Sequence, residues 1–123
     1  MKIYVSHSSN FDYKVELYAP IRESELNKVH RFTLPHEDSD EQYDSRTEMP
    51  EFGMVLAEVS FPSTGQGIEL GWADSETIPI VCIYKTGAKI SGALEVISDV
   101  FIDYDDSQDM IIKFTDFLAQ DTI

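Results

Sequence analysis

The residue of this sequence best placed to do chemistry is Glu69, which follows a glycine-rich segment. Before it, residues 54–57 form an unbroken apolar run, which is typical of a strand buried on both faces of a parallel sheet. Gly65 and Gly67 then allow a tight turn or a close approach of the backbone to a ligand. A helix that follows carries Glu69 beside the carboxyl edge of the sheet, where open α/β sheets bind ligands. The spacing therefore predicts a carboxylate at a ligand-binding edge.

The residues around Glu69 also form a longer motif of the type AEV[ST]xPSxGxGxELGxA. The matching residues are Ala57, Glu58, Val59, Ser60, Pro62, Ser63, Gly65, Gly67, Glu69, Leu70, Gly71 and Ala73. This motif resembles that of the nucleoside 2-deoxyribosyltransferase superfamily, and most closely that of its 2′-deoxynucleoside 5′-phosphate N-hydrolase branch. Such a pattern is far more specific than an isolated pair of glycines.

The resemblance implies cleavage of an N-glycosidic bond in a small nucleoside or nucleotide. Glu69 matches the family's nucleophile, which attacks the anomeric carbon and forms a glycosyl-enzyme ester, as in retaining glycosidases. Water then resolves this ester in a hydrolase, and a second base resolves it in a transferase. Ser63, Gly65 and Gly67 match positions beside the substrate, and Ser63 is also expected to cap the helix. This chemistry requires no metal and no cofactor.

The loop after the first strand both matches the family and departs from it. Tyr4 occupies the position of a substrate-contacting tyrosine at the end of that strand. In the loop, Ser8 keeps the family's serine, His7 replaces a glycine, and Asn10 stands where relatives carry an arginine that contacts the phosphate. Because this arginine is absent, we expect unphosphorylated nucleosides to be preferred over 5′-monophosphates.

Two further positions follow from the resemblance. Relatives place an aspartate that assists proton transfer upstream of the third strand, where an ungapped count reaches Ser45; its neighbour Asp44 is our candidate for this role. Residues 85–92 resemble a family loop that supplies a serine to the pocket of the neighbouring subunit. Ser91 is the matching residue, and the resemblance therefore implies a homodimer.

The composition predicts a single domain spanning residues 1–123, because a chain of this length with 42% hydrophobic residues can bury one core. The lone Cys82 lies in an apolar run and has no intrachain disulfide partner, which indicates a buried side chain in a reducing compartment. No stretch reaches the ~18 consecutive apolar residues of a membrane helix, and the N-terminus is unlike a signal peptide. We therefore expect a cytoplasmic protein.

Charge and histidine spacing exclude other classes of partner. The formal net charge of −14 opposes binding to nucleic acid and to anionic membranes. His7, His30 and His36 lack partners at metal-ligand spacing, so no metal site is expected.

The order of the predicted elements indicates an α/β fold of the flavodoxin-like type, a three-layer sandwich with a five-stranded parallel sheet. The Ser9-x-x-Asp12 capping box predicts a helix with Phe11, Val15 and Tyr18 on one face, which Pro20 ends or kinks. The acidic segment 37–51 is expected to be a mobile loop over the active site. Strands are predicted at 2–5, 30–34, 54–59, 78–84 and 100–104, and later helices at 67–76 and 107–120.

Two alternative functions remain open. The changed residues His7 and Asn10 favour a non-catalytic nucleotide-binding or interaction module that kept the fold. The segment 3–9 also resembles the opening of TIR domains, some of which cleave NAD with a glutamate. Retention of Glu69 with its glycines favours an N-glycosidase or deoxyribosyltransferase.

Overall fold

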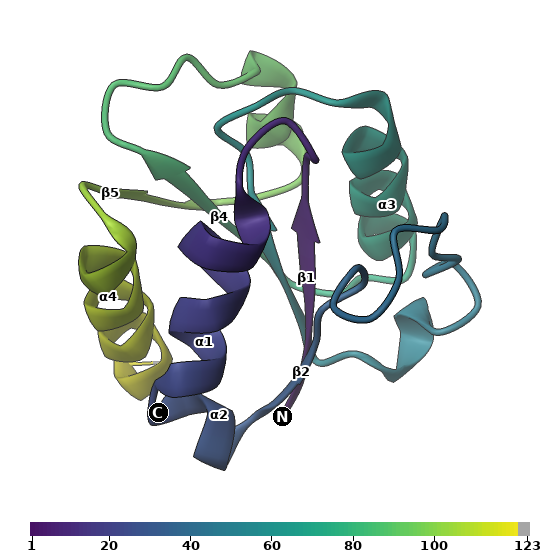
Figure 1. Cartoon of the computed structure of the whole chain (residues 1–123). Coiled ribbons are helices and arrows are strands. Elements are labelled where there is room, and N and C mark those ends of the chain that lie inside the picture. Colours follow the sequence, from purple (N-terminus) through teal and green to yellow (C-terminus); the bar gives the residue numbers. More distant parts are fainter. Residues whose placement is uncertain (121–123) are drawn as a thin grey trace.

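The computed structural model describes residues 1–120, and within this range five strands form one parallel sheet (Figure 1). The strand order is β2-β1-β3-β4-β5. This order is that of the flavodoxin-like doubly wound fold, so the predicted fold class is confirmed. The strands are β1 (Lys2–His7), β2 (Arg31–Thr33), β3 (Met54–Glu58), β4 (Ile80–Lys85) and β5 (Val100–Tyr104).

Every predicted strand is present, with small differences at the ends. The most consequential difference is in β1, which continues past the predicted residue 5 to His7. Ser6 there pairs with Ala57 of β3, and His7 pairs with Glu58. The extension matters because it brings two further polar side chains to the carboxyl edge of the sheet.

Helices cover both faces of the sheet, and the strands are accordingly buried on both sides (Figure 1). Ile3 and Val5 of β1 belong to the core beneath α1 (Ala19–Glu23) and α4 (Ser107–Gln120). Tyr4, between them, belongs to the opposite core beneath α3 (Thr64–Ser75). This alternation of side chains along β1 decides which of its residues can meet Glu69.

The first helix differs from its predicted form. Residues 9–11 form a bend, and the helix begins at Tyr13 without a side-chain cap, so the predicted capping box is wrong. The helix also runs through Pro20 to Glu23. A π-helical turn, η1 (Lys14–Tyr18), precedes Pro20, which lies in the first turn of α1, where a missing N–H is tolerated.

This altered winding changes the face that the first helix buries. Val15 is 64% exposed, contrary to the prediction that it shares a buried face with Phe11 and Tyr18. The buried side chains of the helix are Leu17, Tyr18 and Ile21. A short helix, α2 (Leu26–Val29), follows before β2.

The helix that carries Glu69 begins three residues earlier than predicted. Its N-cap is Ser63, whose Oγ accepts the N–H of Gln66 at 3.2 Å, which confirms the predicted cap. Gly65 is therefore a helical residue rather than a turn residue, and Gly67, where the predicted helix began, is helical as predicted. A Cβ atom at either glycine would meet no atom within 4 Å, so both leave open space beside the helix.

The remaining elements are short helical turns, η2 (Met49–Glu51) and η3 (Gly92–Val96). Cys82 is a free, buried thiol, as expected, and burial raises its pKa. Within residues 1–120, no helix is both long enough and apolar enough to cross a membrane.

Candidate active site

Hydroxyl groups from separate parts of the chain surround the carboxylate of Glu69. The hydroxyl of Tyr4 and the Oγ of Ser45 both donate to Oε2, the latter at 2.8 Å. The Oγ of Ser6 donates to Oε1 at 3.0 Å. Tyr4 and Ser6 are two residues apart on β1 and therefore point to the same face of the sheet, toward α3. Ser45 comes from the long loop between β2 and η2.

These hydrogen bonds fix the orientation of the Glu69 carboxylate, because both of its oxygens have a donor. Burial raises the pKa of Tyr4 well above its ordinary value, and the negative charge of Glu69 and the hydrogen bond to it raise it further. Tyr4 therefore remains a phenol that donates its proton. The two oxygens are not equivalent, since Oε2 accepts from both Tyr4 and Ser45 while Oε1 accepts from Ser6.

Glu69 lines a cavity of about 240 Å³ at the carboxyl edge of the sheet. Aromatic and imidazole rings form much of its wall, and Glu69 is the carboxylate within it. The lining residues are Tyr4, His7, Ser9, Pro35, His36, Gln42, Tyr43, Ser63, Gly65, Gln66 and Glu69. None of these lining residues is a lysine or an arginine, so the wall offers a ligand no positively charged side chain of that kind.

A larger cavity of about 520 Å³ adjoins it along the N-terminal half of α3. Ser63 and Gln66 line both cavities. The larger cavity is mainly apolar and lies between α3 and η3. Its other lining residues are Val59, Pro62, Thr64, Gly67, Leu70, Gly71, Ser91, Ala93, Leu94 and Ile97.

The structure therefore separates the predicted site residues into groups. Tyr4, Ser63 and Gly65 lie with Glu69 in the smaller cavity. Gly67 and Ser91 line the larger one instead, where the exposed Ser91 caps η3 by accepting the N–H of Ala93 at 3.3 Å. We find no contact within this single chain between Ser91 and Glu69.

Ser8 and Asp44 lie outside both groups. Ser8 is buried, and its Oγ accepts the N–H of Asn10 at 3.1 Å, which stabilises the loop after β1. Asp44 is exposed, and its Oδ1 accepts the N–H of Arg46 at 3.1 Å. The contact with Glu69 belongs to the adjacent Ser45, which is fully buried and is the residue that the ungapped count reached.

The sequence places His7 in the loop after the first strand and does not assign it to the site. The Nδ1–H of His7 donates to the carbonyl oxygen of Ser8 at 2.8 Å, so Nε2 is the acceptor for the hydroxyl of Tyr18 at 2.6 Å. Burial lowers the pKa of His7 to about 4, and the ring is neutral near pH 7. Its ring lies 4.4 Å from that of Tyr13, and it lines the cavity as an aromatic surface.

The acidic loop predicted to lie over the active site does contribute to it. Gln42 and Tyr43 line the cavity, and Ser45 contacts Glu69. His36, which directly precedes this loop, is joined to the first helix through Tyr18, whose hydroxyl accepts the N–H of His36 at 3.0 Å. Ser6 and Tyr43 match no position of the family motif. The predicted first strand ended at residue 5, so the placement of Ser6 on the same face as Tyr4 was not predicted.

No protein-family model matches the sequence, and no curated protein matches it. Among solved structures, the chain is similar to a CMP N-glycosidase, BcmB, from Clostridium botulinum. The TM-score is 0.67 at 18% sequence identity, and the alignment covers 94% of this chain and 99% of that one. At this identity the similarity establishes a shared fold, which extends over almost the whole of both chains.

Proposed function

We propose that this protein cleaves the N-glycosidic bond of a nucleoside or nucleotide, with Glu69 as the nucleophile. The observation that carries the proposal is the carboxylate of Glu69, held by the hydroxyls of Tyr4, Ser6 and Ser45 in a cavity at the carboxyl edge of the sheet. The motif around Glu69 and the CMP N-glycosidase of the same fold support the same reaction class.

In the proposed reaction, Oε1 of Glu69 attacks the anomeric carbon, because it accepts one hydrogen bond, from Ser6, whereas Oε2 accepts two, from Tyr4 and Ser45. The carbon–nitrogen bond breaks, and the base leaves with the bonding electron pair and takes up a proton from solvent. Water or a second base then attacks the anomeric carbon of the ester, gives up its proton to solvent, and releases Glu69 as the carboxylate. The proton-transfer role predicted for Asp44 requires a movement of its loop, because this side chain is exposed and lies outside the cavity lining.

A panel of ribo- and deoxyribonucleosides, with and without a 5′-phosphate, tests the reaction class by release of free base. The same assays with an added acceptor base distinguish transfer from hydrolysis. Binding of a panel member without any release of base would contradict the proposal and would favour the non-catalytic module instead.

The charges of the described residues support a preference for unphosphorylated substrates. Among residues 1–120, six of the nine lysines and arginines are paired with carboxylates. The guanidinium of Arg46 lies over the ring of Trp72, 5.9 Å from its centre. A phosphate in the cavity would therefore rely on neutral donors such as the hydroxyl of Ser63 and backbone N–H groups.

We expect kcat/KM for a nucleoside to exceed that for its 5′-monophosphate by about tenfold, since the dianion loses water without gaining a charged partner. The measurement compares both substrates at constant ionic strength. A clear advantage for the monophosphate would contradict the expectation, and would direct attention to Arg46 and Lys89 as residues that reach the phosphate.

Ser91 contributes to the site of a second copy in a homodimer, under the same proposal. The larger cavity, which Ser91 lines, is apolar, and nearby Ile68 and Val96 are 50% and 85% exposed. An apolar surface of this kind is a common feature of contacts between subunits.

We expect light scattering to give the mass of a dimer at micromolar concentration, and Val96→Asp to shift the protein toward a monomer. Val29→Asp serves as the matched control, because Val29 is similarly exposed but lies on α2. A wild-type monomer at the concentration of the assay would exclude this assembly.

A further inference from the structure

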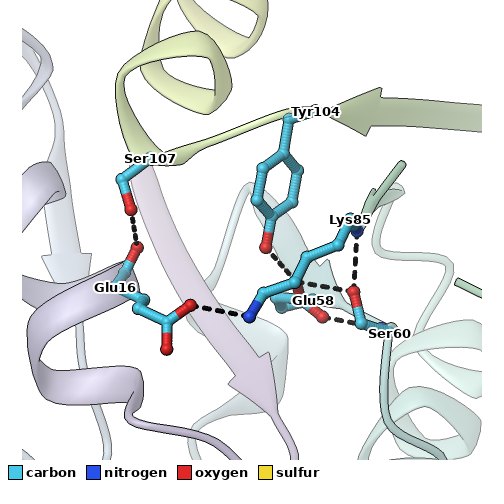
Figure 2. Close-up of polar contacts among 6 residues, drawn as sticks. All are labelled: Glu16, Glu58, Ser60, Lys85, Tyr104 and Ser107. Atoms are coloured by element: carbon cyan, nitrogen blue, oxygen red, sulfur yellow. Dashed lines mark hydrogen bonds and ion pairs between the residues drawn. The ribbon is translucent and has the colours of Figure 1, made fainter. Parts of the chain in front are cut away.

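Glu58, the last residue of β3, is a fully buried acid that the proposed reaction does not use. Its Oε1 accepts the N–H of Ser60 at 2.6 Å, and its Oε2 accepts the Oγ–H of Ser60 at 2.9 Å. The hydroxyl of Tyr104, at the end of β5, also donates to Oε2 (Figure 2). All of these partners are donors, which is the arrangement that a carboxylate anion requires.

The environment of Glu58 opposes its charge in part and supports it in part. Burial raises the pKa of this carboxyl, and this effect outweighs the hydrogen bonds from Tyr104 and Ser60 and the positive charge of Lys85, which lower the pKa. Losing one of these donors would leave a buried carboxylate without a full set of partners, which is costly. The position of the Glu58 side chain is therefore strongly constrained.

The same contacts join the ends of three neighbouring strands. The Oγ of Ser60 accepts the backbone N–H of Lys85 at 2.7 Å, so the turn after β3 is held to the end of β4 as well as to β5. The ammonium group of Lys85 pairs with Glu16 of the first helix at 2.6 Å (Figure 2). Ser107, at the start of α4, donates to the backbone oxygen of Glu16 at 2.7 Å. This arrangement braces the turn that leads into α3.

Gln66 connects this braced turn to the helix that carries Glu69. Its side chain is 5% exposed, and its Nε2 donates to the carbonyl oxygens of Glu58 at 2.8 Å and of Ser6 at 3.2 Å. Ser6 in turn donates its hydroxyl to Glu69, three residues further along α3. The first turns of α3 are therefore tied to Ser6 twice, once through Gln66 and once through Glu69.

We propose that Glu58 and Gln66 are positioning residues for Glu69, which hold the N-terminal turns of α3 on the ends of β1 and β3. The proposal rests on the proposed function for its kinetic consequence, because a nucleophile must be held within about 0.5 Å of its productive position. The structural part of the proposal, that these residues hold Glu69 in contact with Tyr4 and Ser6, does not depend on the substrate.

The test uses Gln66→Met, which keeps the length and apolar contacts of the side chain but removes both donated hydrogen bonds. We expect kcat per folded molecule to fall about tenfold to a hundredfold while KM stays within about threefold, as a displaced nucleophile would produce. Gln108→Met, the same change at an exposed position in the first turn of α4, is the control and should leave both constants unchanged.

Glu58→Gln and Tyr104→Phe each remove part of the hydrogen bonding around Glu58 and keep the rest. Each should give a smaller fall in kcat, again with little change in KM. These variants keep the test decisive if Gln66→Met does not fold. Each assay is run well below the melting temperature of the variant, so that a loss of stability alone leaves kcat per folded molecule unaltered.

A readout that needs no substrate is the ¹³Cδ chemical shift of Glu69, identified by its loss in Glu69→Gln. We expect this signal to move in Gln66→Met and to remain in place in Gln108→Met. If the wild-type protein releases no base from any panel member, the proposed function fails, and the ¹³Cδ signal still decides the positioning proposal. An unchanged signal in folded Gln66→Met overturns it, as does an unchanged kcat in an active protein.

Discussion

Glu69→Gln is expected to lower turnover by about three to six orders of magnitude and to leave the protein folded. The amide has nearly the shape of the carboxylate. Its oxygen can still accept from Tyr4 and Ser45, while its NH2 group faces the hydroxyl of Ser6, which can act as an acceptor. It cannot form the glycosyl ester, however, because it lacks the negative charge of the nucleophile. Release of free base per folded molecule is the measurement, with circular dichroism to verify the fold.

The control for this variant is Glu76→Gln, which removes the exposed carboxylate that follows the last turn of the same helix. It should retain the activity of the wild type. Turnover close to the wild-type value in folded Glu69→Gln would show that another group attacks the sugar, and the assignment of the nucleophile would then be wrong.

The second large effect is expected at Tyr4. Tyr4→Phe removes one donor to Glu69 and leaves the aromatic ring, which packs 5.2 Å from that of Phe52. We expect kcat to fall roughly tenfold to a hundredfold, the equivalent of the ~1.5–3 kcal/mol that a hydrogen bond to a charged group contributes. Tyr84→Phe, on a residue outside both cavity linings, is the matched control.

The pH dependence of the wild type tests the same assignment. The pKa of Tyr4 is raised, so the folded protein holds this proton more tightly than the unfolded chain does, and the phenol persists above its ordinary pKa of ~10. Activity should therefore show no loss from Tyr4 ionisation below about pH 10. A fall in kcat below that pH that is absent from Tyr4→Phe would contradict the donor role.

Much of the fold was predictable because the strands are buried on both faces, which leaves unbroken apolar runs such as residues 54–57. The motif predicted the helix that carries Glu69, although not the first turn of that helix. Gly65 and Gly67 have low helix propensity, which favoured a later start, but the cap by Ser63 and the buried contacts of Gln66 outweigh this preference.

The irregular segments were harder to predict, because the direction of a loop side chain depends on contacts distant in sequence. Ser45 and Asp44 differ by one residue, and nothing in their local pattern indicates which of them is buried against Glu69. The π-helical turn before Pro20 is a similar case, since the local pattern did not indicate it and Val15 within it is exposed.

The strand order also has an evolutionary consequence. β1 and β3 are neighbours in the sheet, yet the helices that follow them cover opposite faces, so a crevice exists at their ends whatever residues line it. Glu69 and Gln66 belong to a helix at this crevice, whereas His36 and Tyr43 line the same cavity from the loop between β2 and η2. Under the proposed function, substitutions at His36 and Tyr43 during evolution would change which base or sugar is accepted without altering Glu69 or its donors on β1.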